Sequence, residues 1–97
     1  MLSQLPINID GVDRGTVDAE ILRAGIIAEL DAVSFYEQMA AKASDERIKT
    51  VLLDVAKEEK EHVGEFQALL LKYDKEQAEE LESGSREVEE ILGQLDK

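Results

Sequence analysis

The chain has 97 residues, 23 of them acidic and 11 basic, which gives a net charge of −12. A chain of this length folds as one small domain that buries only about 60 to 65% of its unfolded surface, so a large enclosed cleft is not expected. The negative charge repels nucleic-acid phosphates and anionic lipids, so we expect no nucleic-acid or membrane partner and favour cations. The absence of cysteine excludes disulfides and thiolate metal sites.

No segment of the sequence has the features of a membrane span or of a signal peptide. The longest apolar runs, such as residues 68–71, are far shorter than the roughly 20 residues that a spanning helix needs. The N-terminus also lacks the basic and then apolar layout of a signal peptide. We therefore expect a soluble, cytoplasmic protein.

The chain divides into three segments. Residues 1–15 contain the only proline, two glycines and no helical period, which predicts an irregular arm. Residues 16–74 carry two apolar stripes with i, i+3, i+4 spacing, one ending near Ala43 and the other running from Ile48 to Tyr73. The polar break between them offers Ser44 or Asp45 as a helix N-cap. Because the connection is so short, the two helices are predicted to form an antiparallel hairpin.

The last segment, residues 75–97, is more polar. Gly84 is interpreted as a break in the pattern, and four apolar residues after it predict a short final helix. These residues are Val88, Ile91, Leu92 and Leu95. We expect an accessory C-terminal helix or tail, and an all-α fold overall.

Two glycines lie inside the predicted hairpin helices. Gly25 and Gly64 each cost about 1 kcal/mol relative to alanine in a helix. Such a cost suggests that the two helices approach each other closely at these positions.

Two glutamates interrupt otherwise apolar helix faces. A charged residue inside a buried stripe is costly unless it is paired or bound to a metal, and Glu29 and Glu59 occupy such positions. His62, the only histidine, follows Glu59 at i+3, so their side chains lie about 60° apart on one face of the helix. Antiparallel pairing brings Glu29 level with them, which predicts a metal site.

The donor types favour iron. Two hard carboxylates and one imidazole suit a divalent first-row metal. Ferritin-like di-iron bundles use one Glu from each of two helices and a Glu-x-x-His from each of the other two. This chain supplies one Glu29 and one Glu59/His62 pair, which is half of such a site. A two-fold homodimer would complete the ligand set and form a ferritin-like four-helix bundle.

Other residues near these ligands have more than one interpretation. Glu58 could ligate in place of Glu59, but it lies nearer the polar edge and also reads as surface charge. Glu65 reads as a surface charge or as part of a route for cations. Tyr36, two turns after Glu29, could hydrogen-bond a metal-bound carboxylate, or it could be a core tyrosine whose hydroxyl contacts solvent.

The segments "IIAELDAVSFYEQMA" and "LLDVAKEEKEHVGEFQALLL" resemble the encapsulated ferritin-like proteins, the cargo ferritins of encapsulin nanocompartments. The resemblance covers about residues 21–73. It implies ferroxidase ligands at Glu29, Glu59 and His62, with two iron ions per dimer in a di-iron centre shared by two subunits. It also implies assembly to a ring-like decamer and a location inside an encapsulin shell.

The sequence departs from that family at some positions. Asp31 matches one of two acidic residues that flank the first ligand and take up metal in many members, but Ala28 stands at the other. Phe35 stands where some members have Trp. No encapsulin-targeting peptide is recognisable after Leu95, and some relatives are fused ahead of the shell protein. The chain is therefore interpreted as a cargo protein or as a domain of a shell fusion.

The Glu–Glu–His pattern and the family resemblance together predict a ferroxidase; the resemblance implies that it oxidises Fe(II) with O2 and delivers iron for storage in an encapsulin shell. An alternative is a non-enzymatic helical oligomerisation module with an adventitious cation site. A rubrerythrin-like peroxidase is a third interpretation, weakened by the absence of cysteine for a rubredoxin centre.

Overall fold

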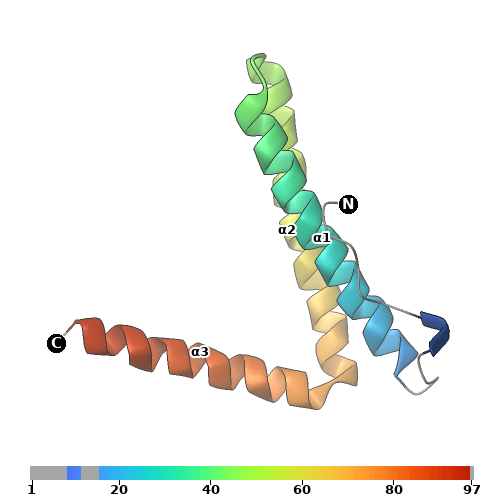
Figure 1. The fold of residues 1–97 in the computed structure, drawn as a ribbon, viewed down its shortest axis with the longest axis vertical. Coiled ribbons are helices and arrows are strands. Elements are labelled where there is room, and N and C mark those ends of the chain that lie inside the picture. The colour runs from blue at the N-terminus through green and yellow to red at the C-terminus, as the bar shows by residue number, and fades with distance from the viewer. Residues whose placement is uncertain (1–8, 12–15, 97) are drawn as a thin grey trace.

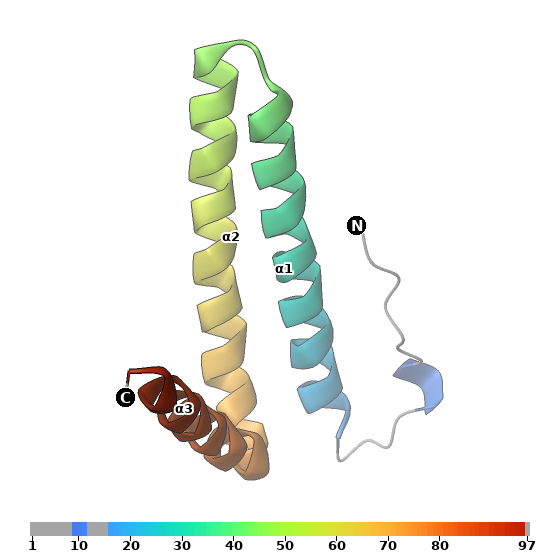
Figure 2. The same cartoon turned by 60° about the vertical axis from the view of Figure 1, so that its left-hand side comes forward.

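The computed structural model describes residues 9–11 and 16–96, and every regular element in this part is helical. The elements are η1 (Ile9–Gly11), α1 (Val17–Lys42), α2 (Glu46–Tyr73) and α3 (Lys75–Leu95). Helices α1 and α2 lie side by side as an antiparallel hairpin, and α3 projects away from its base (Figures 1 and 2). The predicted all-α hairpin with a C-terminal helix is confirmed. Most of the predicted irregular arm lies outside the described residues.

The turn at the tip of the hairpin is defined by a helix cap. Of the two candidates, Asp45 is the N-cap of α2, and its carboxylate accepts a hydrogen bond from the Arg47 N–H at 2.8 Å. The Arg47 side chain, followed by its backbone N–H, lowers the pKa of Asp45 from its ordinary value. The cap ends the short connection between α1 and α2 and so starts α2 close to the end of α1.

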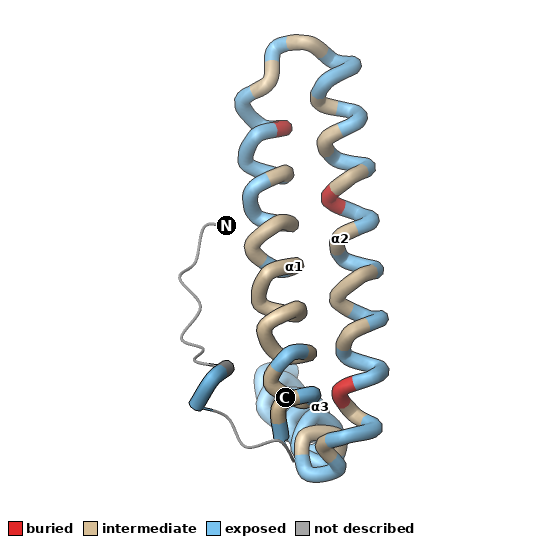
Figure 3. Tube along the Cα trace, turned by 90° about the vertical axis from the view of Figure 1, so that its right-hand side faces the viewer, coloured by how far each residue is buried: buried red, intermediate tan, exposed pale blue. Residues whose placement is uncertain are grey.

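The hairpin buries little of its apolar surface. Ala40, Ala56 and Leu70 are the buried apolar residues of the described part, and they lie with the half-buried residues along the facing sides of α1 and α2 (Figure 3). Large apolar side chains remain exposed on each of the three α-helices. They are Ile21, Leu30, Phe35, Met39, Ile48, Val51, Leu53, Leu69, Tyr73, Leu81, Val88, Ile91, Leu92 and Leu95. A single copy therefore leaves much of its apolar surface in contact with water.

The prediction that Gly84 interrupts the last segment is wrong. Helix α3 continues through this residue from Lys75 to Leu95. Most residues around the glycine favour helix, and the cost of one glycine, about 1 kcal/mol, does not break a helix of this length. The apolar side chains of α3 line one face of the helix, and the residues after Leu81 are exposed. No helix in the described part is both long and apolar enough to cross a membrane.

A single residue, Asp74, separates α2 from α3. It ends α2 and caps α3, accepting a hydrogen bond from the Gln77 N–H at 2.9 Å and one from Arg23 Nη2 at 2.6 Å. The Gln77 N–H and then Arg23 lower the pKa of Asp74. The stabilisation from the ionised carboxylate is therefore present above the ordinary aspartate pKa of about 3.9 and is lost as the pH falls through the lowered value.

The two glycines of the hairpin should respond differently to substitution. Gly64→Ala should raise the thermal unfolding midpoint, because alanine favours helix by about 1 kcal/mol and a Cβ there meets no atom within 4 Å. Gly25→Ala should gain less or destabilise the hairpin, because its Cβ would lie 3.2 Å from Phe66 Cδ2. Circular dichroism melts of both variants provide the comparison. Equal gains would contradict a close contact at Gly25.

Candidate metal centre

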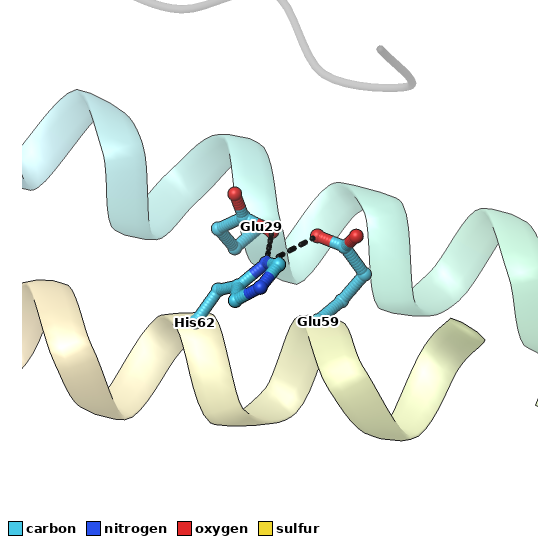
Figure 4. Close-up of side chains that lie close together, drawn as sticks. All are labelled: Glu29, Glu59 and His62. Carbon is cyan, nitrogen blue, oxygen red and sulfur yellow. Dashed lines mark ion pairs between the residues drawn. The ribbon is translucent and has the colours of Figure 1, made fainter. Parts of the chain in front are cut away.

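Three side chains from two helices converge in the hairpin. Glu29 lies in the middle of α1, while Glu59 and His62 lie about one turn apart on α2. Antiparallel packing places Glu29 level with the α2 pair, and the three side chains point toward one another (Figure 4). We refer to these three residues as the Glu–Glu–His cluster.

The cluster is tight. Each residue offers one ligand atom, and the three atoms lie within 4.8 Å of one another. His62 Nδ1 lies 3.4 Å from Glu29 Oε2 and 3.5 Å from Glu59 Oε2. The Glu29 and Glu59 side chains are 20% and 18% exposed, whereas that of His62 is 42% exposed. The carboxylates therefore lie inside the hairpin and the imidazole lies toward its surface.

One oxygen of the cluster lacks a hydrogen bond. Glu29 Oε2 is shielded from solvent and accepts no hydrogen bond, even from the nearby His62 ring. A buried polar atom in this state costs about 1 to 3 kcal/mol, and more when it is charged. A cation bound among the three residues would satisfy this oxygen. Two carboxylates and one imidazole form a donor set that suits a divalent first-row metal.

The cluster carboxylates have no ion pair with a lysine or arginine of the described residues. Arg23 pairs with Glu20 and Asp74, and Lys60 pairs with Glu37 at 3.0 Å. Three protein ligands also leave coordination positions open, for a substrate or for ligands from another chain.

The remaining predicted residues lie outside the cluster. Glu58 and Glu65 are exposed on α2, and Asp31 is half-buried on α1. Tyr36 is half-buried with its ring edge-on to Phe35, at 5.3 Å between centroids and 79° between planes. No hydrogen bond links Tyr36 to the cluster within this single copy. A role for these residues in metal binding or uptake stays a prediction.

Metal affinity should depend on the cluster and not on acidity alone. Glu59→Ala and His62→Ala should each weaken Zn(II) binding roughly tenfold or more, because each removes a ligand. Glu58→Ala removes an equal charge from the adjacent exposed position and should leave the affinity nearly unchanged. Isothermal titration calorimetry measures all three. A Glu58→Ala variant as weak as Glu59→Ala would contradict the assignment.

Comparison with known proteins places this geometry in a family. A solved structure, the crystal structure of the encapsulated ferritin domain from Pyrococcus furiosus, superposes with a TM-score of 0.82 at 54% sequence identity. The match covers 96% of this chain and 97% of that chain. Close agreement over nearly the whole length supports the same helical architecture in both proteins.

Two longer relatives match part of the chain. The ferritin-like-encapsulin shell fusion protein of Pyrococcus furiosus is 61% identical over 74 residues, which are 76% of this chain and 21% of that protein. The encapsulin nanocompartment cargo protein EncC of Myxococcus xanthus is 37% identical over 70 residues, which are 69% of this chain and 54% of that protein. The chain thus matches only about a fifth and a half of these relatives.

The family model described as EncFtn-like matches residues 5–84, a range that includes the whole Glu–Glu–His cluster. Together with the sequence identities and the structural match, this confirms the family resemblance seen in the sequence. The chain belongs to the EncFtn-like family.

Proposed function

We propose that the chain is a ferroxidase that oxidises Fe(II) with O2 at a site shared by two copies. The observation that carries the proposal is the solvent-shielded Glu29 oxygen, which lacks a hydrogen bond and lies within a Glu–Glu–His cluster. Such an arrangement is costly for a purely structural group and is suited to holding a cation. The net charge of −12 also raises the local concentration of cations.

The exposed apolar face of α2 supports a shared site. Val51, Leu69 and Tyr73 are 61%, 47% and 63% exposed, and their helical spacing places them on the same side of α2 as His62. A second copy packed on this face would cover the apolar side chains and bring a second cluster toward the first. A two-fold axis there would gather two copies each of Glu29, Glu59 and His62 around two iron ions.

Each ligand has a chemical role in this proposal. The Glu29 and Glu59 carboxylates hold Fe(II) as substrate and favour the harder Fe(III) product, while His62 contributes a neutral nitrogen donor. Two Fe(II) ions give one electron each to O2, which takes up two protons and leaves as hydrogen peroxide. The ferric product then moves to storage outside the dimer, because a hairpin of this size encloses no storage cavity.

The relatives indicate where this reaction would take place. One match is named as a fusion to an encapsulin shell and another as an encapsulin nanocompartment cargo protein. We propose by similarity that this chain works inside an encapsulin compartment in the cytoplasm, as cargo or as a fused domain. Its dimers would assemble further, to a decamer, with the exposed apolar face of α3 offering additional contact surface.

The same apolar faces favour the alternative function, a non-enzymatic oligomerisation module with an adventitious cation site. The two proposals differ in the fate of iron. A ferroxidase turns over Fe(II), whereas an oligomerisation module binds metal without oxidising it.

Aerobic addition of Fe(II) should produce ferric absorbance in the ultraviolet well above the rate in buffer. Glu59→Ala and His62→Ala should each abolish most of this activity with helix content intact, because each removes a ligand. Glu82→Ala, an exposed change on α3, should retain it. A wild-type trace that matches buffer would support the oligomerisation module, and equal losses in all three variants would contradict the site.

Metal should promote association. Without metal, four carboxylates would converge at the dimer axis, and their mutual repulsion opposes assembly. Zn(II), or Fe(II) without oxygen, should therefore raise the mass measured by light scattering at protein concentrations where the metal-free protein is partly dissociated.

Glu59→Gln provides the control for this coupling. The amide removes a charge while weakening metal binding, so the variant should assemble more readily without metal and respond less to added Zn(II). Equal masses with and without metal for the wild-type protein would exclude a shared site.

A further inference from the structure

The bend between α2 and α3 has no helix-breaking residue. Residues 65–83 contain neither glycine nor proline, and most of them favour helix. A run of this composition is expected to continue as one helix, because each added residue extends a helix that is already formed. The bend at Asp74 therefore requires a specific interaction to maintain it.

The side chain of Asp74 supplies that interaction. Its backbone is non-helical, with φ −126° and ψ 88°, and one carboxylate oxygen caps α3 through the Gln77 N–H. The other oxygen accepts a hydrogen bond from Arg23 on α1, at 2.6 Å from Nη2. Arg23 is also paired with Glu20. The junction is thus tied to α1 as well as to the start of α3.

Little else holds α3 against the hairpin. Its apolar contact is limited to its first two turns, where Gln77 and Leu81 line a shallow groove with Ile27 and Leu70. Beyond Leu81 the residues of α3 are exposed, and the helix extends away from α1 and α2 (Figure 1). Arg23, Glu20, Asp18 and Tyr73 line a pocket together with Asp74, and Lys72, Lys75 and Glu76 flank Asp74 along the chain. Among the described residues, Arg23 is the cation that forms an ion pair with Asp74.

We propose that the Asp74–Arg23 pair is a latch that holds α3 bent away from α2, and that without it the two helices join into one. Joining is physically accessible because the bend is a single residue long and contains neither glycine nor proline. The latch thereby fixes the direction in which α3 presents its apolar face, which includes Val88, Leu92 and Leu95.

The two states differ strongly in shape. A continuous helix from Glu46 to Leu95 would be about 75 Å long at the usual helical rise. The chain as folded extends 50 Å along its longest axis, with a radius of gyration of 17.2 Å. Loss of the latch therefore changes distances between α2 and α3 far more than side-chain motion could.

Spin labels test the latch directly. The chain has no native cysteine, so Lys57→Cys on α2 and Glu90→Cys on α3, both exposed, place two labels on one chain. Dilution into excess unlabelled protein restricts pulsed dipolar spectroscopy to distances within one copy. The unaltered junction should give a distance well below the value of about 50 Å expected for a continuous helix.

Two variants then remove the latch. Asp74→Ala eliminates both the cap and the ion pair and should move a large share of the distribution to about 50 Å. Arg23→Met keeps the cap and similar bulk, so it should give a smaller share at the same distance. Asp45→Ala removes a matched aspartate cap at the other end of α2 and should leave the distances unchanged. If both Asp74→Ala and Arg23→Met gave the same distance distribution as the unaltered junction, the proposal would be overturned.

Folding is monitored separately by circular dichroism. Because a joined helix keeps the residues of α2 and α3 helical, the helix content of Asp74→Ala should equal or exceed that of the wild type. If Asp74→Ala fails to fold, Arg23→Met decides the question alone. An Arg23→Met distribution that matches the wild type then overturns the latch. The measurement needs no iron, so its outcome is independent of the ferroxidase proposal.

Discussion

The Glu29 carboxylate, held between two helices without a hydrogen bond to one of its oxygens, is the constraint around which the hairpin is arranged. Glu59 and His62 lie level with it because α1 and α2 run antiparallel from a short capped turn. The hairpin could bury an apolar side chain at this position at lower cost. A carboxylate at this position is explained if the cluster binds a cation, because the cation would offset both the charge of Glu29 and its missing hydrogen bond.

The small core has the same origin. A two-helix hairpin has one internal seam, and here part of that seam is taken up by the Glu–Glu–His cluster, so only three apolar residues of the described part are buried. The remaining apolar side chains lie along faces that a single copy cannot cover. The proposed contact between chains would serve both stability and metal binding, since the same face of α2 carries His62 and the exposed Val51 and Leu69.

Local patterns in the sequence predicted the hairpin and predicted that Glu29 lies level with Glu59 and His62. The i, i+3 spacing of Glu59 and His62 is a property of one helix, and the short turn fixed how that helix pairs with α1. The Asp74–Arg23 pair could not be predicted, because its partners lie 51 residues apart and no periodicity links them. Gly84 misled the prediction, because the helix-forming residues around it outweigh one glycine. Nor does the sequence indicate that Nδ1 of His62 is the ring nitrogen nearest the carboxylates.

The contact between Gly25 and Phe66 sets the distance between α1 and α2 beside the Glu–Glu–His cluster. Gly25 lies one helical turn before Glu29, and Phe66 lies one turn after His62, so the ring resting on the glycine fixes the separation of the helices beside the ligands. A pair of residues outside the cluster would then influence the ionic radius that the cluster can accommodate. Selectivity among divalent ions would, on this basis, be a property of helix packing as much as of donor chemistry.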